Sequence, residues 1–227
     1  MNIAIILSGG LGNRIGTDVP KQYLKVKEQY VIKYCMDTIF SCEEIDCVHI
    51  VADMKWYSII EACINKDYRN KFMGFSRPGN NRQMSIYNAL CDIEKYAECA
   101  DKIIIHDAAR PFVKTDTIVN LIDALDEYDG AIPVLPMKDT VYMVDNAEIA
   151  SLLSRDSVKA GQAPEGFLFG KYIDANRKLI PDDIMKINGS TEVAFLSGMS
   201  IKCIDGDENN YKITTKEDLI RWQNESV

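Results

Sequence analysis

Short apolar runs alternate with longer segments of helical periodicity along most of this 227-residue chain. Such alternation predicts a mostly parallel, doubly wound α/β sheet with helices on both faces, because each helix returns the chain to the start of the next strand. The last helix follows Thr214-x-x-Glu217, which predicts a capping box. The expected strands span residues 3–7, 48–52, 72–76, 102–106, 131–136 and 200–205, and the expected helices span residues 31–40, 56–65, 82–96, 116–128, 170–179 and 216–224.

Residues 139–154 interrupt this alternation. Two β-like runs, residues 140–144 and 149–153, flank the turn-prone pair Asp145-Asn146. We expect an antiparallel hairpin arm that projects from the sheet, either to contact a second subunit or as a simple surface flap. No linker, internal repeat or low-complexity tract is visible, so residues 1–227 are expected to form a single domain.

Composition excludes several classes of partner. A hydrophobic content of 47% supports a complete core. No apolar run approaches the roughly 18–20 residues of a membrane span, and no basic region precedes the first strand, so we expect a cytoplasmic protein. A net charge of −8 argues against binding to nucleic acid or to a membrane surface. An anionic substrate would therefore need a few local cations.

The seven cysteines contain no C-x-x-C pair, and the chain has only two histidines. A Cys/His zinc site is therefore not expected. Cys35, Cys47 and Cys203 lie in apolar helix or strand patterns, which predicts reduced thiols packed in the core.

The loop after the first strand is rich in glycine and reads L-S-G-G-L-G-N-R-I-G-T-D-V-P-K from Leu7 to Lys21. Glycines let several backbone N–H groups point at one anion, and Arg14 and Lys21 add positive charge. This combination predicts a triphosphate site, whereas the alternative is a flexible loop with two solvated cations. Because strand ends share one edge of the sheet, Lys212, in the loop before the last helix, is expected to converge on the same polyphosphate.

A dinucleotide fingerprint explains this loop less well. Gly10-x-Gly12-x-x-Ile15 lacks the third glycine, and Pro20 interrupts the place where the helix should run. A nicotinamide-dependent oxidoreductase is therefore disfavoured.

Two further segments carry polar residues at strand ends. Gly79-Asn80-Asn81-Arg82-Gln83-Met84-Ser85 predicts a tight turn that reads a base edge, or alternatively an ordinary helix cap by Asn80 or Asn81. His106-Asp107-Ala108-Ala109-Arg110-Pro111 places a carboxylate where Mg²⁺ and substrate phosphates could meet, with a structural ion pair between Asp107 and Arg110 as the alternative.

Together these segments resemble the cytidylyltransferases that act on polyol phosphates, the 2-C-methyl-D-erythritol 4-phosphate and ribitol-5-phosphate enzymes. The resemblance runs nearly end to end. It is carried by G-G-L-G-N-R with P-K-Q-Y-L, by G-N-N-R-Q-M-S, by H-D-A-A-R-P-F-V, by R-D-S-V-K-A-G-Q-A-P, and by N-Y-K-I-T with E-D-L.

The resemblance implies a Rossmann-like nucleotidyltransferase fold and transfer of CMP from CTP to a polyol phosphate, with Mg²⁺ or another divalent cation as cofactor. It also implies a homodimer that exchanges its 139–154 arm, so that Thr140 and Arg155 would serve the neighbouring subunit's site. The implied residues are Arg14, Lys21 and Lys212 in catalysis, Ser8, Gly9, Gly10, Gly12, Gly79, Asn80, Arg82, Ser85 and Ala108 on the nucleotide, Arg110, Thr140 and Arg155 on the acceptor, and Asp107 on the metal.

Two segments depart from the family pattern. Gln162-Ala163-Pro164-Glu165 stands where Q-T-P-Q is usual, and the segment from Asn188 to Glu192 replaces a T-D-D-A-S-like run. Both departures are expected on the acceptor side, so the acceptor is either 2-C-methyl-D-erythritol 4-phosphate, of isoprenoid synthesis, or a ribitol 5-phosphate-like precursor of surface glycans. The alternatives are another phosphorylated acceptor and a non-catalytic nucleotide-binding module.

Overall fold

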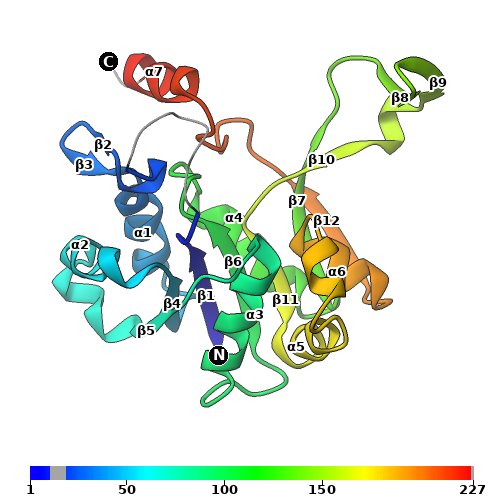
Figure 1. Ribbon diagram of the computed structural model, residues 1–227. Coiled ribbons are helices and arrows are strands. Elements are labelled where there is room, and N and C mark those ends of the chain that lie inside the picture. The colour runs from blue at the N-terminus through cyan, green and yellow to red at the C-terminus, as the bar shows by residue number, and fades with distance from the viewer. Residues whose placement is uncertain (11–18, 226–227) are drawn as a thin grey trace.

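The computed structural model describes residues 1–10 and 19–225. Their centre is an eight-stranded sheet in which seven strands lie in the order β10-β7-β11-β6-β1-β4-β5 and β12 pairs with β7 (Figure 1). The strands are β1 (Asn2–Leu7), β4 (Cys47–Val51), β5 (Phe72–Ser76), β6 (Lys102–Asp107), β7 (Gly130–Pro136), β10 (Lys159–Gly161), β11 (Glu165–Leu168) and β12 (Ile201–Asp205).

The direction of the strands creates a switch point at β1. β1 pairs in parallel with β4 on one side and with β6 on the other, and β4 pairs in parallel with β5. The chain therefore moves outward from β1 and then returns across it to β6. Because the helices that follow β1 and β5 pack on opposite faces of the sheet, the loops at the carboxyl ends of these two strands diverge and leave a crevice for a ligand.

Helices cover both faces of the sheet because the side chains of each buried strand alternate between two cores. Ala4 and Ile6 of β1 face one hydrophobic core, and Ile3 and Ile5 face the other. The first core packs against α1 (Val31–Ser41), α2 (Tyr57–Cys63) and α4 (Thr115–Ala124), and the second against α3 (Arg82–Ile93), α5 (Phe169–Arg177) and α6 (Ser190–Leu196). The predicted doubly wound, mostly parallel sheet is confirmed.

Several short elements differ from the prediction. The two antiparallel strands β10 and β11, the small hairpin of β2 (Lys25–Val26) and β3 (Gln29–Tyr30), and α6 were not predicted. Short 3-10 helices span Lys21–Tyr23, Met54–Trp56, Lys66–Lys71, Arg155–Ser157 and Asp183–Lys186. β11 inserts between β6 and β7 and pairs with both in antiparallel fashion. Its position depends on long-range pairing, which has no local sequence pattern.

The final helix α7 (Lys216–Glu225) is capped one residue later than predicted. The Asp218 carboxylate accepts from Thr214 N and Thr215 N at 2.7 and 2.8 Å, and Thr215 Oγ1 accepts from Asp218 N at 3.3 Å. The reciprocal capping pair is therefore Thr215 with Asp218, and the predicted pair of Thr214 with Glu217 is wrong. Both carboxylates lie in the first turn, so the sequence alone does not separate them.

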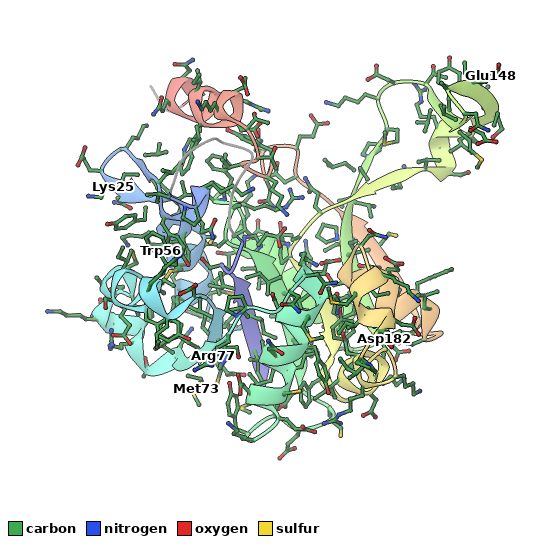
Figure 2. The ribbon with its side chains drawn as sticks, viewed as in Figure 1. Lys25, Trp56, Met73, Arg77, Glu148 and Asp182 are labelled. Carbon is green, nitrogen blue, oxygen red and sulfur yellow. The ribbon has the colours of Figure 1, made fainter. Side chains whose placement is uncertain are left out.

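The arm consists of β8 (Val141–Asp145) and β9 (Glu148–Leu153), which pair with each other in antiparallel fashion. It projects from the sheet, and Glu148 lies at its far end (Figures 1 and 2). Asn146 and Ala147 adopt φ of 48° and 67°, which matches a two-residue hairpin turn. Its exposed apolar side chains are Tyr142, Met143, Val144, Ile149 and Leu152.

In the described ranges, no helix is long and apolar enough to cross a membrane. Of the three cysteines predicted in the core, Cys35 is buried, Cys47 is half-buried and Cys203 is exposed. The prediction for Cys203 is wrong, because β12, among the described strands, pairs only with β7 at the edge of the sheet and leaves that residue exposed.

Candidate active site

A cavity of about 470 Å³ opens at the carboxyl ends of β1, β5 and β6. This volume is ordinary for a small-molecule site. Its described lining contains three cations, Lys21, Arg82 and Lys212, against one carboxylate, Asp107. The local charge is therefore positive in a protein of net charge −8. The other lining residues are Leu7, Gly9, Gly10, Gln22, Gly79, Asn80, Asn81, Ser85, Ala109 and Thr214.

The segment Lys21–Tyr23 explains how the β1 loop is held. The buried Gln22 side chain donates to Ser8 O and Gly10 O, both at 2.8 Å. Tyr23 Oη accepts from Ser8 Oγ at 2.7 Å, and the Tyr23 ring stacks on Trp56 with centroids 4.2 Å apart. Gln22 and Tyr23 thus fix the loop from behind while Lys21 lines the cavity.

The Gly79 turn forms the opposite wall. Asn81 caps α3 by accepting from Met84 N at 2.7 Å, so the predicted helix cap is present and belongs to Asn81. Ser85 Oγ accepts from Gly79 N at 2.9 Å and donates to Asn81 O at the same distance, which closes the turn. A Cβ at Gly79 would lie 2.3 Å from Met84 Cγ, so this close approach requires glycine. Asn80 remains at the cavity wall without a capping function.

Arg82, Asp107 and Lys212 form an ion-pair chain along the cavity. Arg82 Nε lies 3.1 Å from Asp107 Oδ1, and Lys212 Nζ lies 2.7 Å from Asp107 Oδ2. Burial raises the pKa of the Asp107 carboxyl, but the two cations outweigh burial and hold that pKa well below its usual range. Asp107 is therefore an anion at any physiological pH.

Arg110 does not pair with Asp107, so the structural ion pair considered from the sequence is wrong. Its Nη1 instead donates to Asn210 O at 2.7 Å, and its Nε is buried with no hydrogen-bond partner in the described part of the chain. His106 Nε2 lies 2.9 Å from Arg110 O and donates to it. Burial lowers the pKa of His106 to about 4, so this histidine is neutral and anchors the turn.

Glu165 is a buried carboxylate that the sequence analysis did not connect to Arg82. Arg82 Nη2 donates to Glu165 Oε2 at 3.1 Å, and Thr191 Oγ1 donates to Glu165 Oε1 at 2.7 Å. Ser190 Oγ also donates to Glu165 and accepts from Arg82 Nη1 at 2.7 Å. The two segments that depart from the family pattern therefore contact each other behind Arg82.

The structure brings most, but not all, of the predicted residues together. Around the cavity lie Gly9, Gly10, Lys21, Gly79, Asn80, Arg82, Ser85, Asp107 and Lys212. Ser8 and Ala108 are buried behind the wall, and Arg110 lies outside the described lining. Thr140 and Arg155 lie at the base of the arm, where Arg155 Nη1 donates to Lys138 O at 3.2 Å. Gly12 and Arg14 lie outside the described residues.

A second polar cluster has different chemistry. Ser76 Oγ donates to Asp92 at 2.6 Å and lies 2.8 Å from His49 Nε2. A catalytic triad places histidine between the hydroxyl and the carboxylate, whereas here serine occupies the middle. Burial also lowers the pKa of His49 to about 4. We interpret this cluster as a structural link between β4, β5 and α3.

Comparison with known proteins identifies the family of the chain. The family model for 2-C-methyl-D-erythritol 4-phosphate cytidylyltransferase matches residues 2–224. The chain belongs to this family. Membership makes the protein a nucleotidyltransferase of the cytidylyltransferase class.

Individual relatives extend over the whole chain. The chain is 31% identical over 220 residues to the 2-C-methyl-D-erythritol 4-phosphate cytidylyltransferase of Neorickettsia sennetsu, with 95% of this chain and 92% of that one covered. It is 33% identical over 220 residues to the protein of the same name from Clostridium botulinum, with 96% and 94% covered. The crystal structure of 4-diphosphocytidyl-2C-methyl-D-erythritol synthase from Anaerococcus prevotii matches with a TM-score of 0.85 and 24% identity over 99% of this chain and 95% of that one. That similarity supports the shared fold.

Proposed function

We propose that the protein transfers CMP from CTP to 2-C-methyl-D-erythritol 4-phosphate and releases pyrophosphate. The observation that carries the proposal is the cavity at the switch point, where Lys21, Lys212 and the β1 loop face the Gly79 turn. Three cations beside backbone N–H groups suit a triphosphate, and the tight turn suits a base edge. In this arrangement Gly79, Asn80 and Ser85 read the cytosine.

The choice of acceptor rests on the positions of Glu165 and Ser190. From the sequence, the departures at these residues left a ribitol 5-phosphate-like acceptor as plausible as 2-C-methyl-D-erythritol 4-phosphate. Both side chains are buried, contact each other and lie outside the described cavity lining. This contact suggests that the two departures serve each other rather than the acceptor, and it favours the acceptor of the family. Relatives at 31–33% identity are named for 2-C-methyl-D-erythritol 4-phosphate, which supports this acceptor.

Cytidylyl transfer requires that the two substrates are positioned for in-line attack and that the charge on the reacting phosphates is neutralised. A phosphate oxygen of the acceptor attacks the α-phosphorus of CTP in line, the new P–O bond forms, and the bond to the β-phosphate oxygen breaks. The attacking oxygen is already ionised at neutral pH, so no residue has to remove a proton from it. Lys21 and Lys212, with Arg14 from the glycine-rich loop, neutralise the charge that develops on the phosphorus oxygens.

Mg²⁺ fits this cavity if the phosphates of the bound nucleotide supply most of its ligands. Asp107 is the single carboxylate in the described lining, and both its oxygens already contact cations. Mg²⁺ is commonly bound through one or two carboxylates with substrate phosphates and waters as the remaining ligands. Asp107 would hold the ion, which would supply charge neutralisation on the triphosphate when bound.

The acceptor site is proposed to be shared between two subunits. Arg110 has a buried Nε without a partner among the described residues, which suits a phosphate of the acceptor. Thr140 and Arg155 lie on the arm segment, and the exposed apolar side chains of the arm suit burial against a second copy. We therefore assign Thr140 and Arg155 to the partner's site in a homodimer.

A pyrophosphate-release assay with CTP, Mg²⁺ and a panel of polyol phosphates tests the function. We expect rapid release with 2-C-methyl-D-erythritol 4-phosphate and slow release with ribitol 5-phosphate. Preference for ribitol 5-phosphate would show that the acceptor is wrong. CTP binding without release on any acceptor would favour a nucleotide-binding module without catalysis.

A further inference from the structure

Glu165 is buried in the middle of the sheet, although a carboxylate there is costly unless it is fully paired. It is the first residue of β11 and is 7% exposed. Arg82 Nη2, Ser190 Oγ, Thr191 N and Thr191 Oγ1 all donate to its two oxygens. Every contact is a donor, so the surroundings are built for the ionised carboxylate.

Arg82 connects this buried carboxylate to the cavity. Its three nitrogen donors are divided among Asp107 through Nε, Ser190 through Nη1 and Glu165 through Nη2. The result is a chain of alternating charge, Glu165–Arg82–Asp107–Lys212. Glu165 lies behind the described wall of the cavity, and the other three members line it.

We propose that Glu165 is a positioning residue for cytidylyl transfer and acts through Arg82. Glu165 binds Nη2 of the Arg82 guanidinium, so Arg82 donates to Asp107 through Nε alone. The second oxygen of Asp107, Oδ2, therefore stays available to Lys212. Without the charge on Glu165, the guanidinium is expected to turn and bind Asp107 through two nitrogens, a geometry that arginine and carboxylate favour. Lys212 would then lose the partner that aims it into the cavity.

A purely structural function for Glu165 predicts a different result. In that case Glu165 would only join β11 to α6 through Ser190 and Thr191. A glutamine has the same size and retains hydrogen-bonding capacity, so Glu165→Gln would then cost stability but little catalytic rate. Because a displacement of about 1 Å in a catalytic group costs about a hundredfold in rate, the positioning function predicts a large loss of kcat.

The experiment compares three variants with the wild-type enzyme in the pyrophosphate-release assay. Glu165→Gln removes the charge, and the matched control Thr191→Val removes one hydrogen bond to the same carboxylate while leaving Arg82 its partner. The double variant Glu165→Gln/Ser190→Asp returns a carboxylate to Arg82 from α6, because Ser190 Oγ already lies 2.7 Å from Arg82 Nη1. Thermal melting and the Kd for CTP by calorimetry accompany the kinetics.

We expect Glu165→Gln to lower kcat by about a hundredfold and to raise the Kd for CTP by a much smaller factor, because Arg82 and Lys212 shift while Lys21 and the Gly79 turn, which is closed by its own bonds, stay in place. Thr191→Val should keep the wild-type kcat, and the double variant should regain most of it. A wild-type kcat in Glu165→Gln, or an equal loss in Thr191→Val, would overturn the proposal. If Glu165→Gln does not fold, a folded but inactive double variant overturns it.

This inference rests on the proposed function, and the same assay separates the two failures. Absence of pyrophosphate release from the wild-type enzyme with every acceptor would refute the function, and with it the positioning of reacting groups. An active wild type whose kcat is unaffected by Glu165→Gln would refute the inference alone.

Discussion

Lys21 and Gln22 are adjacent residues with different functions. Lys21 lines the cavity, whereas Gln22 turns inward and holds Ser8 O and Gly10 O. We expect Lys21→Ala to lower kcat on the order of a hundredfold, because loss of one well-placed donor at a reacting phosphate costs about 2.7–4 kcal/mol. The measurement is kcat by pyrophosphate release. Lys25→Ala, at an exposed position on β2, is the matched control and should retain full activity.

A near-wild-type kcat in Lys21→Ala, with unchanged circular dichroism, would rule out the function assigned to this residue. A loss in Lys25→Ala of similar size would show that general surface charge, rather than a single cation, steers the nucleotide.

The charged residues that line the cavity were predictable from the sequence, because glycines, cations and a carboxylate at strand ends form a pattern. Gln22 and Glu165 were not predicted as supports of the site. Each forms a hydrogen bond with a residue that is distant along the chain. Gln22 donates to the backbone of Ser8, and Glu165 accepts from the side chain of Arg82. A buried polar residue with such a function carries no spacing signal.

At the scale of elements, Asn80 and Asn81 are expected to contribute separately to CTP binding and to stability, although both lie in one turn. Asn81→Ala is expected to lower the free energy of unfolding by about 1 kcal/mol, because it removes the side-chain cap of α3. Asn80→Ala removes a cavity-wall side chain without a capping bond, so it should leave stability unchanged and weaken CTP binding. Urea denaturation and calorimetric titration with CTP measure the two effects. A loss of stability in Asn80→Ala, or weaker CTP binding in Asn81→Ala at unchanged stability, would contradict these assignments.

The arm is the second element with a testable function. If Arg155 serves the neighbouring subunit, a heterodimer of Arg155→Ala and Lys212→Ala contains one site with both residues intact and one with neither. An equal mixture of the two inactive variants, unfolded and refolded together, should regain about a quarter of the wild-type activity. Activity that stays at the level of the separate variants would place both residues in the site of one chain.

The long elements followed from periodicity, and the short ones depended on the rest of the fold. Helices α1, α3 and α4 and strands β1, β5 and β6 agree with prediction within a few residues at each end. β10 and β11 are three and four residues long and are antiparallel. Glu165 begins a central strand, where a charged residue is not expected. The projection of the arm was predicted, because a hairpin has no place in a parallel sheet.

At the scale of the whole molecule, two buried histidines make stability depend on pH. Burial lowers the pKa of His49 and of His106 to about 4, whereas the unfolded chain binds these protons at about pH 6.5. Between these values the unfolded state holds more protons, so stability falls as the pH falls. Each histidine contributes up to about 1.4 kcal/mol per pH unit in this window.

Denaturant unfolding at pH 7, 6 and 5 measures the slope. We expect the free energy of unfolding of the wild type to decrease across this range, and the slope to be smaller in His49→Gln and in His106→Gln. Equal stability of the wild type at pH 7 and pH 5 would contradict neutral, buried histidines.

Isotope labelling tests most directly whether a phosphate oxygen of 2-C-methyl-D-erythritol 4-phosphate attacks the α-phosphorus of CTP. The acceptor is prepared with ¹⁸O in its terminal phosphate oxygens, and both products are analysed by mass spectrometry. We predict that all of the label remains in the cytidine diphosphate product and that the released pyrophosphate carries none. Label in the pyrophosphate, or the absence of a labelled cytidine product, would contradict the proposed transfer.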